Sequence, residues 1–213
     1  AALGWGEEVR AYGYCGQLRP YKGVEDLVTA FRALPDPAAR LLIAGMPRDG
    51  GIAATLQGLA GDDPRITLRL ENLSPEAFRA ALGACDLVVA PFHHYLHSGS
   101  IVHALSAGRP VLTPATPFAS SLAAELGRPD WLQTYEGPLT PAALAAAGAP
   151  ATPLDLALLA PAAAARRIKG FIAGLTGRPA EIPDNAAEIR AEIPATPRSI
   201  PEPAAAAEQT DQG

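Results

Sequence analysis

The sequence contains little lysine, few aromatic residues and only two cysteines. Of its 213 residues, 18% are charged, 6% are aromatic and two are lysines. Arg and Lys number 17 and Asp and Glu 22, so the formal net charge is −5. This balance excludes the broad basic surface that binds nucleic acid. The cysteines, Cys15 and Cys85, lie in apolar stretches, which excludes a disulfide scaffold and favours a reducing compartment.

Long hydrophobic runs and nucleotide-binding glycine motifs are also lacking. The most apolar stretch, residues 141–165, is interrupted by Pro150, Pro153, Asp155 and Pro161, which argues against a membrane span. No signal-peptide pattern precedes the first predicted strand, so we expect a cytoplasmic protein. Neither G-x-G-x-x-G after the first strand nor a P-loop occurs, which disfavours a dinucleotide dehydrogenase and a P-loop nucleotidase.

The acidity is concentrated at one end of the chain. Residues 1–178 carry 15 acidic and 15 basic side chains, whereas residues 179–213 carry 7 and 2. From position 178 onward the sequence also has six prolines and no aromatic residue. This composition predicts a globular domain over 1–177, followed by an acidic, Pro- and Ala-rich flexible tail over 178–213.

Apolar strand-like runs alternate with helical patterns along the domain. Strands are predicted at 9–16, 40–46, 65–70, 86–90, 110–113 and 131–135. Helices are predicted at 23–34, 52–59, 74–84, 98–107, 120–126, 141–147 and 157–175. Continuously apolar strands that alternate with helices indicate an α/β fold, in which helices cover both faces of a parallel sheet.

In such sheets, ligands bind at the carboxyl ends of the strands, close to helix N-termini. This rule directs attention to the segments after Gly16, Met46, Leu70, Ala90 and Thr113. The first segment carries Arg19 and Lys22, two cations that would suit a phosphate or diphosphate. A solvated loop lysine and an arginine paired with a nearby carboxylate are the alternatives.

The segment 91–108 contains all four histidines and the sequence Ser98-Gly99-Ser100 at a predicted helix start. Free N–H groups there, with two hydroxyls and a glycine, can hold an anion, although an ordinary N-cap would explain Ser98 alone. We expect the histidines to contact a ligand's hydroxyls or phosphates. Zinc binding through His93 and His97 is disfavoured because no Asp, Glu or Cys is close in sequence. A Ser/His nucleophile is disfavoured because the G-x-S-x-G turn is missing.

These segments together resemble the C-terminal domain of group-one, or family-four, retaining glycosyltransferases of the two-domain, Rossmann-like GT-B architecture. The similarity is carried, in order, by GQLRPYKGVEDLVTAFRAL at 16–34, RLLIAG at 40–45, CDLVVAPF at 85–92 and SGSIVHALSAGRPVLTP at 98–114. It covers about residues 9–175. The resemblance implies one half of a GT-B enzyme, with the N-terminal acceptor domain absent from this sequence.

The resemblance also implies roles for individual residues. Lys22 matches the family's diphosphate-binding lysine, and Arg19 takes the place of an arginine that the family has where this chain has Gln17. The family's paired donor-binding glutamates fall on Tyr95 and His103, as in a Ser-Gly-Ser subgroup without the acidic pair. His103 is then expected at the ribose and Tyr95, with His97, at the donor sugar. Asn72 is expected near the base; a helix lead-in is the alternative.

The function implied is transfer of a sugar, with retained configuration, from a GDP- or UDP-sugar to a glycan or lipid-linked acceptor. No cofactor and no bound metal are expected, since the nucleotide sugar is the substrate. We expect donor binding but no transfer from these 213 residues alone. The alternatives are a non-catalytic nucleotide-sugar-binding module and a nucleotide-sugar epimerase. Arg166, Arg167 and Lys169 indicate peripheral contact with the inner membrane face, or a helix that packs toward the other domain.

Overall fold

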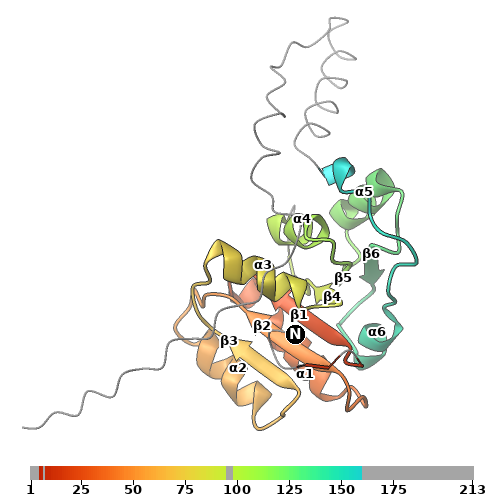
Figure 1. Cartoon of the computed structure of the whole chain (residues 1–213). Coiled ribbons are helices and arrows are strands. Elements are labelled where there is room, and N and C mark those ends of the chain that lie inside the picture. The colour runs from red at the N-terminus through yellow and green to blue at the C-terminus, as the bar shows by residue number, and fades with distance from the viewer. Residues whose placement is uncertain (1–4, 7, 95–97, 160–213) are drawn as a thin grey trace, which may run out of the picture.

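The protein was analysed as a computed structural model, which describes residues 5, 6, 8–94 and 98–159 (Figure 1). Within these residues, six parallel strands form one sheet in the order β3-β2-β1-β4-β5-β6. The strands are β1 (Ala11–Cys15), β2 (Arg40–Ala44), β3 (Ile66–Arg69), β4 (Leu87–Val89), β5 (Val111–Pro114) and β6 (Leu132–Tyr135). All strand pairs of this sheet are parallel, as the sequence predicts.

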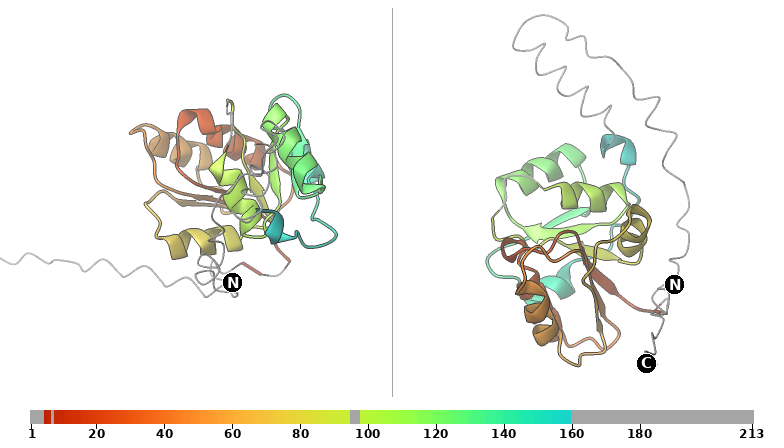
Figure 2. Two further views of the ribbon diagram at one scale, coloured as in Figure 1. Left: turned by 90° about the horizontal axis from the view of Figure 1, so that it is seen from above. Right: turned by 90° about the vertical axis from the view of Figure 1, so that its left-hand side faces the viewer.

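Helices connect successive strands and cover both faces of the sheet. They are α1 (Val24–Arg32), α2 (Ile52–Ala60), α3 (Pro75–Gly83), α4 (Gly99–Ser106), α5 (Pro117–Leu126) and α6 (Pro141–Ala146), with 3₁₀ turns η1 (Pro20–Lys22) and η2 (Leu156–Leu159). Figure 2 shows α1 and α2 on one face of the sheet and α3 and α4 on the other. The predicted α/β architecture is therefore confirmed. None of the helices among the described residues has both the length and the apolar character that a bilayer crossing requires.

Three helices begin with a Ser or Thr N-cap followed by proline. Ser74, Thr116 and Thr140 are the N-cap residues of α3, α5 and α6, and each is followed by proline. Each hydroxyl accepts a hydrogen bond, of 3.1 to 3.2 Å, from the backbone N–H three residues on. Proline is favourable there because the first helical N–H has no partner in the helix. The Thr116 cap explains why α5 starts at Pro117, three residues before the predicted start at 120.

Burial follows the strand order. The side chains of β1 and β4 are buried throughout, whereas those of the edge strand β3 are only partly buried. Both cysteines are buried and free, as expected. Of the predicted helix 157–175, the described residues contain only the start, which forms η2 (Leu156–Leu159). The remainder of that helix, with Arg166, Arg167 and Lys169, and the predicted flexible tail 178–213 lie outside the described residues.

The loops after β1 and β2 approach each other more closely than side chains would permit. Gly45, directly after β2, has φ of 153° and its Cα faces the backbone of Gly16, directly after β1. A Cβ at position 45 would overlap the Gly16 carbonyl oxygen. The Gly16 N–H in turn donates to the Ala44 carbonyl at 2.9 Å. The two strand ends are therefore held together by backbone contact that only glycine at 45 allows.

We expect Gly45→Ala to lower the free energy of unfolding by about 2–4 kcal/mol, because it combines backbone strain with overpacking. Gly58→Ala in α2 is the matched control, since open space surrounds that position. This control should be neutral or stabilising by up to about 1 kcal/mol, as alanine favours helix over glycine. Denaturant unfolding of both variants measures the difference. Equal stability of the two would contradict the close approach.

Candidate functional site

The strand order reverses direction between β1 and β4. From β1 the chain proceeds outward through β2 and β3, and from β4 it proceeds the other way through β5 and β6. The loops that follow β1 and β4 therefore diverge to opposite faces of the sheet. In open α/β sheets, this divergence creates a crevice at the carboxyl ends of the strands, where ligands bind.

A pocket of about 390 Å³ lies at this crevice. Five elements contribute to it: the loops after β1, β2 and β3, the helix α3 and the first turns of α4. Its lining residues are Gly16, Gln17, Gly45, Met46, Arg48, Asn72, Leu73, Phe78, Gly99, Ser100 and His103. The pocket thus brings together residues up to 87 positions apart in the sequence. Its floor includes the two glycines, Gly16 and Gly45, whose backbones meet there.

The N-terminus of α4 forms one end of the pocket. Ser98 is 4% exposed and its hydroxyl accepts a hydrogen bond from the Ile101 N–H at 3.4 Å, so it caps the helix. Gly99 and Ser100 line the pocket instead. A Cβ placed on Gly16 would lie 3.3 Å from Ser100 Oγ, which shows how close α4 comes to the loop after β1. Free N–H groups in a first helical turn favour an anion at this end.

Lys22 follows β1 in the same loop as the pocket residue Gln17, but it does not line the pocket. Its ammonium nitrogen lies 3.8 Å from the ring centroid of Phe92 and 5.2 Å from that of Tyr21, in cation–π contacts. Burial, and secondarily the positive charge of Arg19, lowers the pKa of Lys22 below its ordinary value. No ion pair joins Lys22 or Arg19 to a carboxylate among the described residues. The positive charge here is therefore uncompensated within the described part of the chain.

Arg19 is exposed and its guanidinium donates to the side-chain oxygen of Gln17 at 3.5 Å. Gln17 lines the pocket, whereas Arg19 does not. The alternative in which Arg19 pairs with a carboxylate does not occur among the described residues. Arg19 is thus linked to the pocket through one glutamine.

The loops after β1 and β4 are joined by His93. Its backbone N–H donates to the Tyr21 carbonyl at 3.0 Å, and its Nε2 lies 2.6 Å from Oδ2 of Asp26 in α1. Gly23 permits this approach, since a Cβ there would meet the Pro91 carbonyl. His93 therefore positions loops. Across the described segments, no three His, Cys, Asp or Glu side chains gather as metal ligands.

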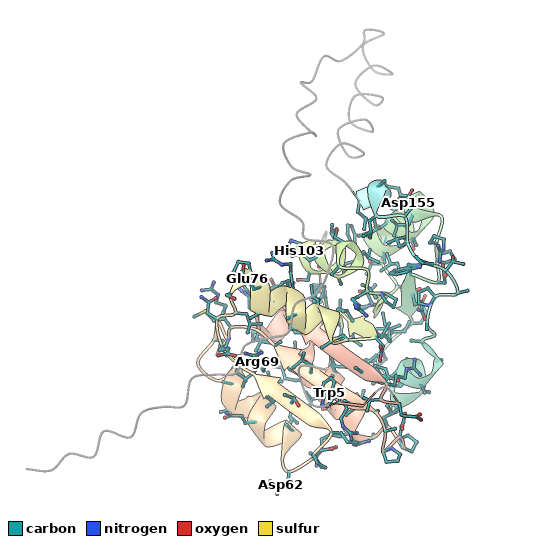
Figure 3. All side chains as sticks on the ribbon, in the orientation of Figure 1. Trp5, Asp62, Arg69, Glu76, His103 and Asp155 are labelled. Atoms are coloured by element: carbon teal, nitrogen blue, oxygen red, sulfur yellow. The ribbon has the colours of Figure 1, made fainter. Side chains whose placement is uncertain are left out.

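The other end of the pocket is formed by the loops after β2 and β3. Met46 and Arg48 follow β2, and Asn72 and Leu73 follow β3. The ring of Phe78 in α3 meets the His103 ring edge to face, with 6.1 Å between centroids. Figure 3 shows His103 on α4 beside the start of α3, where Glu76 lies. The aromatic ring of Phe78 and the polar side chains of Arg48 and Asn72 at this end suit a heterocyclic base.

Several of the residues predicted to bind the donor line the pocket. Asn72, Gly99, Ser100 and His103 come together in the pocket, while Ser98 caps α4. Arg19 and Lys22 do not line the pocket. Tyr95 and His97 lie outside the described residues.

Leu73 lines the pocket beside Asn72, and Met46, Arg48 and Phe78 also line it but were not predicted. The rule that ligands bind after each parallel strand pointed to the segment of Arg48, but no pattern in the sequence distinguished that arginine from the others.

The family described as Glycosyl transferases group 1 has a sequence model that matches residues 10–147 of this chain. A GDP-mannose:glycolipid 4-β-D-mannosyltransferase from Xanthomonas campestris pv. campestris is 36% identical over 122 residues. That match covers 57% of this chain and 35% of the relative, so it spans about a third of the relative's length.

Solved glycosyltransferase structures share the fold. AviGT4, a glycosyltransferase involved in avilamycin A biosynthesis, superposes with a TM-score of 0.55 and 15% identity, over 82% of this chain and 54% of AviGT4. WaaG, a glycosyltransferase of lipopolysaccharide biosynthesis, has a TM-score of 0.50 and 20% identity, over 67% of this chain and 37% of WaaG. The parallel sheet is thus the Rossmann-like unit of GT-B glycosyltransferases. With the family match across both ends of the pocket, the chain belongs to the group 1 glycosyltransferases.

Proposed function

We propose that the chain binds a nucleoside diphosphate sugar in the pocket formed by the loops after β1, β2 and β3 and by α3 and α4, as the donor-binding part of a hexosyltransferase. The observation that carries the proposal is the pocket itself. One end offers the N-terminus of α4 with uncompensated cations beside it, and the other offers Asn72 and Phe78. Family membership and the mannosyltransferase relative support the assignment, and the relative's name suggests a glycolipid acceptor.

The reaction exchanges one oxygen for another at the sugar's C1. The bond from C1 to the diphosphate oxygen breaks, a bond to the acceptor hydroxyl oxygen forms, and the acceptor proton is released. Negative charge accumulates on the departing diphosphate. Fixed donors and cations aimed at that charge lower the barrier. In this chain, the N–H groups at Gly99 and Ser100 and the ammonium of Lys22 would supply that stabilisation.

The environment of Lys22 fits this role. Its ammonium is half-buried over Phe92, where burial disfavours the charged form and lowers the pKa of the lysine. A diphosphate beside it would offset that penalty, because opposite charges attract more strongly away from bulk water. The charged form of Lys22 would therefore be more stable with a diphosphate bound than in the free protein. This pattern is typical of a functional site.

Replacing Lys22 with alanine should weaken GDP and UDP binding to the 213-residue chain by about tenfold or more, since a charge-assisted hydrogen bond contributes about 1.5–3 kcal/mol. Calorimetry with both nucleotides measures the change. Arg79→Ala is the control, because Arg79 is exposed, pairs with Glu76 and does not line the pocket. Unchanged affinity in the Lys22 variant would remove that residue from the donor site, and no binding of either nucleotide by the native chain would overturn the proposed function.

The lowered pKa of Lys22 makes donor affinity sensitive to alkaline pH. The protonated lysine binds the diphosphate, so affinity should fall as pH rises through the pKa of Lys22 in the free protein. Because that pKa lies below the ordinary lysine value of 10.5, the decline should begin at a lower pH than for an exposed lysine. Lys22→Arg should shift the decline upward, since guanidinium stays charged. Identical pH profiles for the two proteins would contradict this role of Lys22.

The stereochemistry of transfer is open to direct measurement. The sequence resemblance implies retention. The relative's name, however, describes a β-D-mannosyl product, and GDP-mannose carries its mannose in α linkage, so that product requires inversion at C1. We propose inversion for this chain. Proton NMR of the first product, made by the protein of the whole reading frame containing residues 1–213, should show the configuration opposite to the donor's. An early product with the donor's configuration would establish retention instead.

A further inference from the structure

We propose that Arg48 makes the donor site selective for guanine, its guanidinium donating two hydrogen bonds to O6 and N7 of the base. The inference rests on the proposed function, because it assumes that a nucleotide occupies the pocket. It adds the identity of the base and the residue that recognises it.

The backbone of Arg48 is held at the rim of the pocket. Leu18 N–H donates to the Met46 carbonyl at 3.0 Å, and Arg48 N–H donates to the Leu18 carbonyl at 3.0 Å. These bonds form a short parallel bridge between Leu18 and Pro47, which extends the pairing of the loops beyond β1 and β2. Leu18 is fully buried and anchors this bridge. The position of Arg48 relative to the pocket is therefore fixed by backbone hydrogen bonds.

The guanidinium of Arg48 has no hydrogen bond or ion pair with any described residue, although it belongs to the pocket lining. Other arginines of the domain are paired with carboxylates close in sequence: Arg65 with Asp63, Arg69 with Glu71, Arg79 with Glu76 and Arg128 with Asp130. The acidic neighbour of Arg48, Asp49, instead accepts a hydrogen bond from Gly51 N–H at 2.9 Å, at the start of α2. Arg48 thus keeps its donors available to a ligand.

Arg48 also lies at the appropriate end of the pocket. The anion-binding end is at α4, which follows β4, whereas Arg48 follows β2, two strands away in the sheet. Adjacent strands are about 4.8 Å apart, so the two ends are separated by about 10 Å. An extended nucleoside diphosphate spans a comparable length between its diphosphate and the outer edge of its base. With the diphosphate at Ser100, the base therefore lies between Phe78, Asn72 and Arg48.

The chemistry of the bases determines which one this arrangement favours. Guanine presents two adjacent acceptors, O6 and N7, and the planar fork of arginine matches both at once. Adenine replaces the first acceptor with an amino donor, which opposes arginine. Uracil has a single carbonyl oxygen on the corresponding edge, so arginine can make only one such bond. Asn72 on the neighbouring loop carries an amide oxygen that can accept from an amino group of guanine.

Calorimetry with GDP and UDP on the 213-residue chain tests the inference. The native chain should prefer GDP by about 10- to 100-fold, the discrimination of a good bidentate pair. Arg48→Lys keeps the charge but loses the fork, so it should lower GDP affinity about tenfold, change UDP affinity by less than about twofold, and remove most of the preference. Arg79→Lys is the matched control and should preserve the native ratio, because Arg79 pairs with Glu76 and does not line the pocket. Unchanged thermal unfolding verifies that each variant is folded.

The outcomes distinguish guanine recognition by Arg48 from the proposed binding of a nucleotide sugar in the pocket. A GDP preference that Arg48→Lys leaves intact, an equal loss of GDP and UDP affinity, or a native preference for UDP would overturn guanine recognition by Arg48. In each of these cases the nucleotide still binds, and the proposed function stands. Failure of the native chain to bind either nucleotide would overturn the proposed function, and the inference with it.

Discussion

The backbone contact between Gly16 and Gly45 is the constraint on which the site depends. It holds the ends of β1 and β2 so close that no Cβ fits at position 45. The bridge between Leu18 and Pro47 positions Arg48 at the pocket rim. The loop after β1, which contains Leu18, also contains Lys22, whose ammonium lies over the Phe92 ring. Ser100 of α4 packs against Gly16 on the other side. The loops after β1 and β2 and the start of α4 thus meet around two residues without side chains, beside the pocket at the ends of the strands.

Ion pairs neutralise only part of the positive charge of the described domain. Several arginines form ion pairs with carboxylates within three residues of them, as Arg65 does with Asp63. These local pairs contribute little to stability when exposed, but they remove positive charge from the general surface. Lys22 and Arg48 lack such partners among the described residues; Arg48 lines the pocket, and Lys22 lies in the loop after β1.

The candidate site could be predicted from the sequence only where a local signal marks a residue. Ser98-Gly99-Ser100 is recognisable because a helix start after a buried strand is a local pattern. Asn72 and His103 were proposed through the family resemblance, and both line the pocket. Arg48 and Phe78 were missed, because their importance arises from packing between distant elements. Lys22 stays a prediction, and its contact with the Phe92 ring depends on how two loops meet, which sequence spacing does not determine.

The sequence by itself determined the alternation of strands and helices, the parallel sheet and the helix starts at Ser74, Ser98 and Thr140. These depend on hydrophobic periodicity and on contacts within a few residues. Tertiary structure alone decided that β1 lies between β2 and β4, that His93 joins Asp26, and that Arg48 faces the pocket without a carboxylate partner among the described residues. The reason is physical: strand order and loop contacts depend on the free energy of packing the whole domain, to which residues far apart in the sequence contribute.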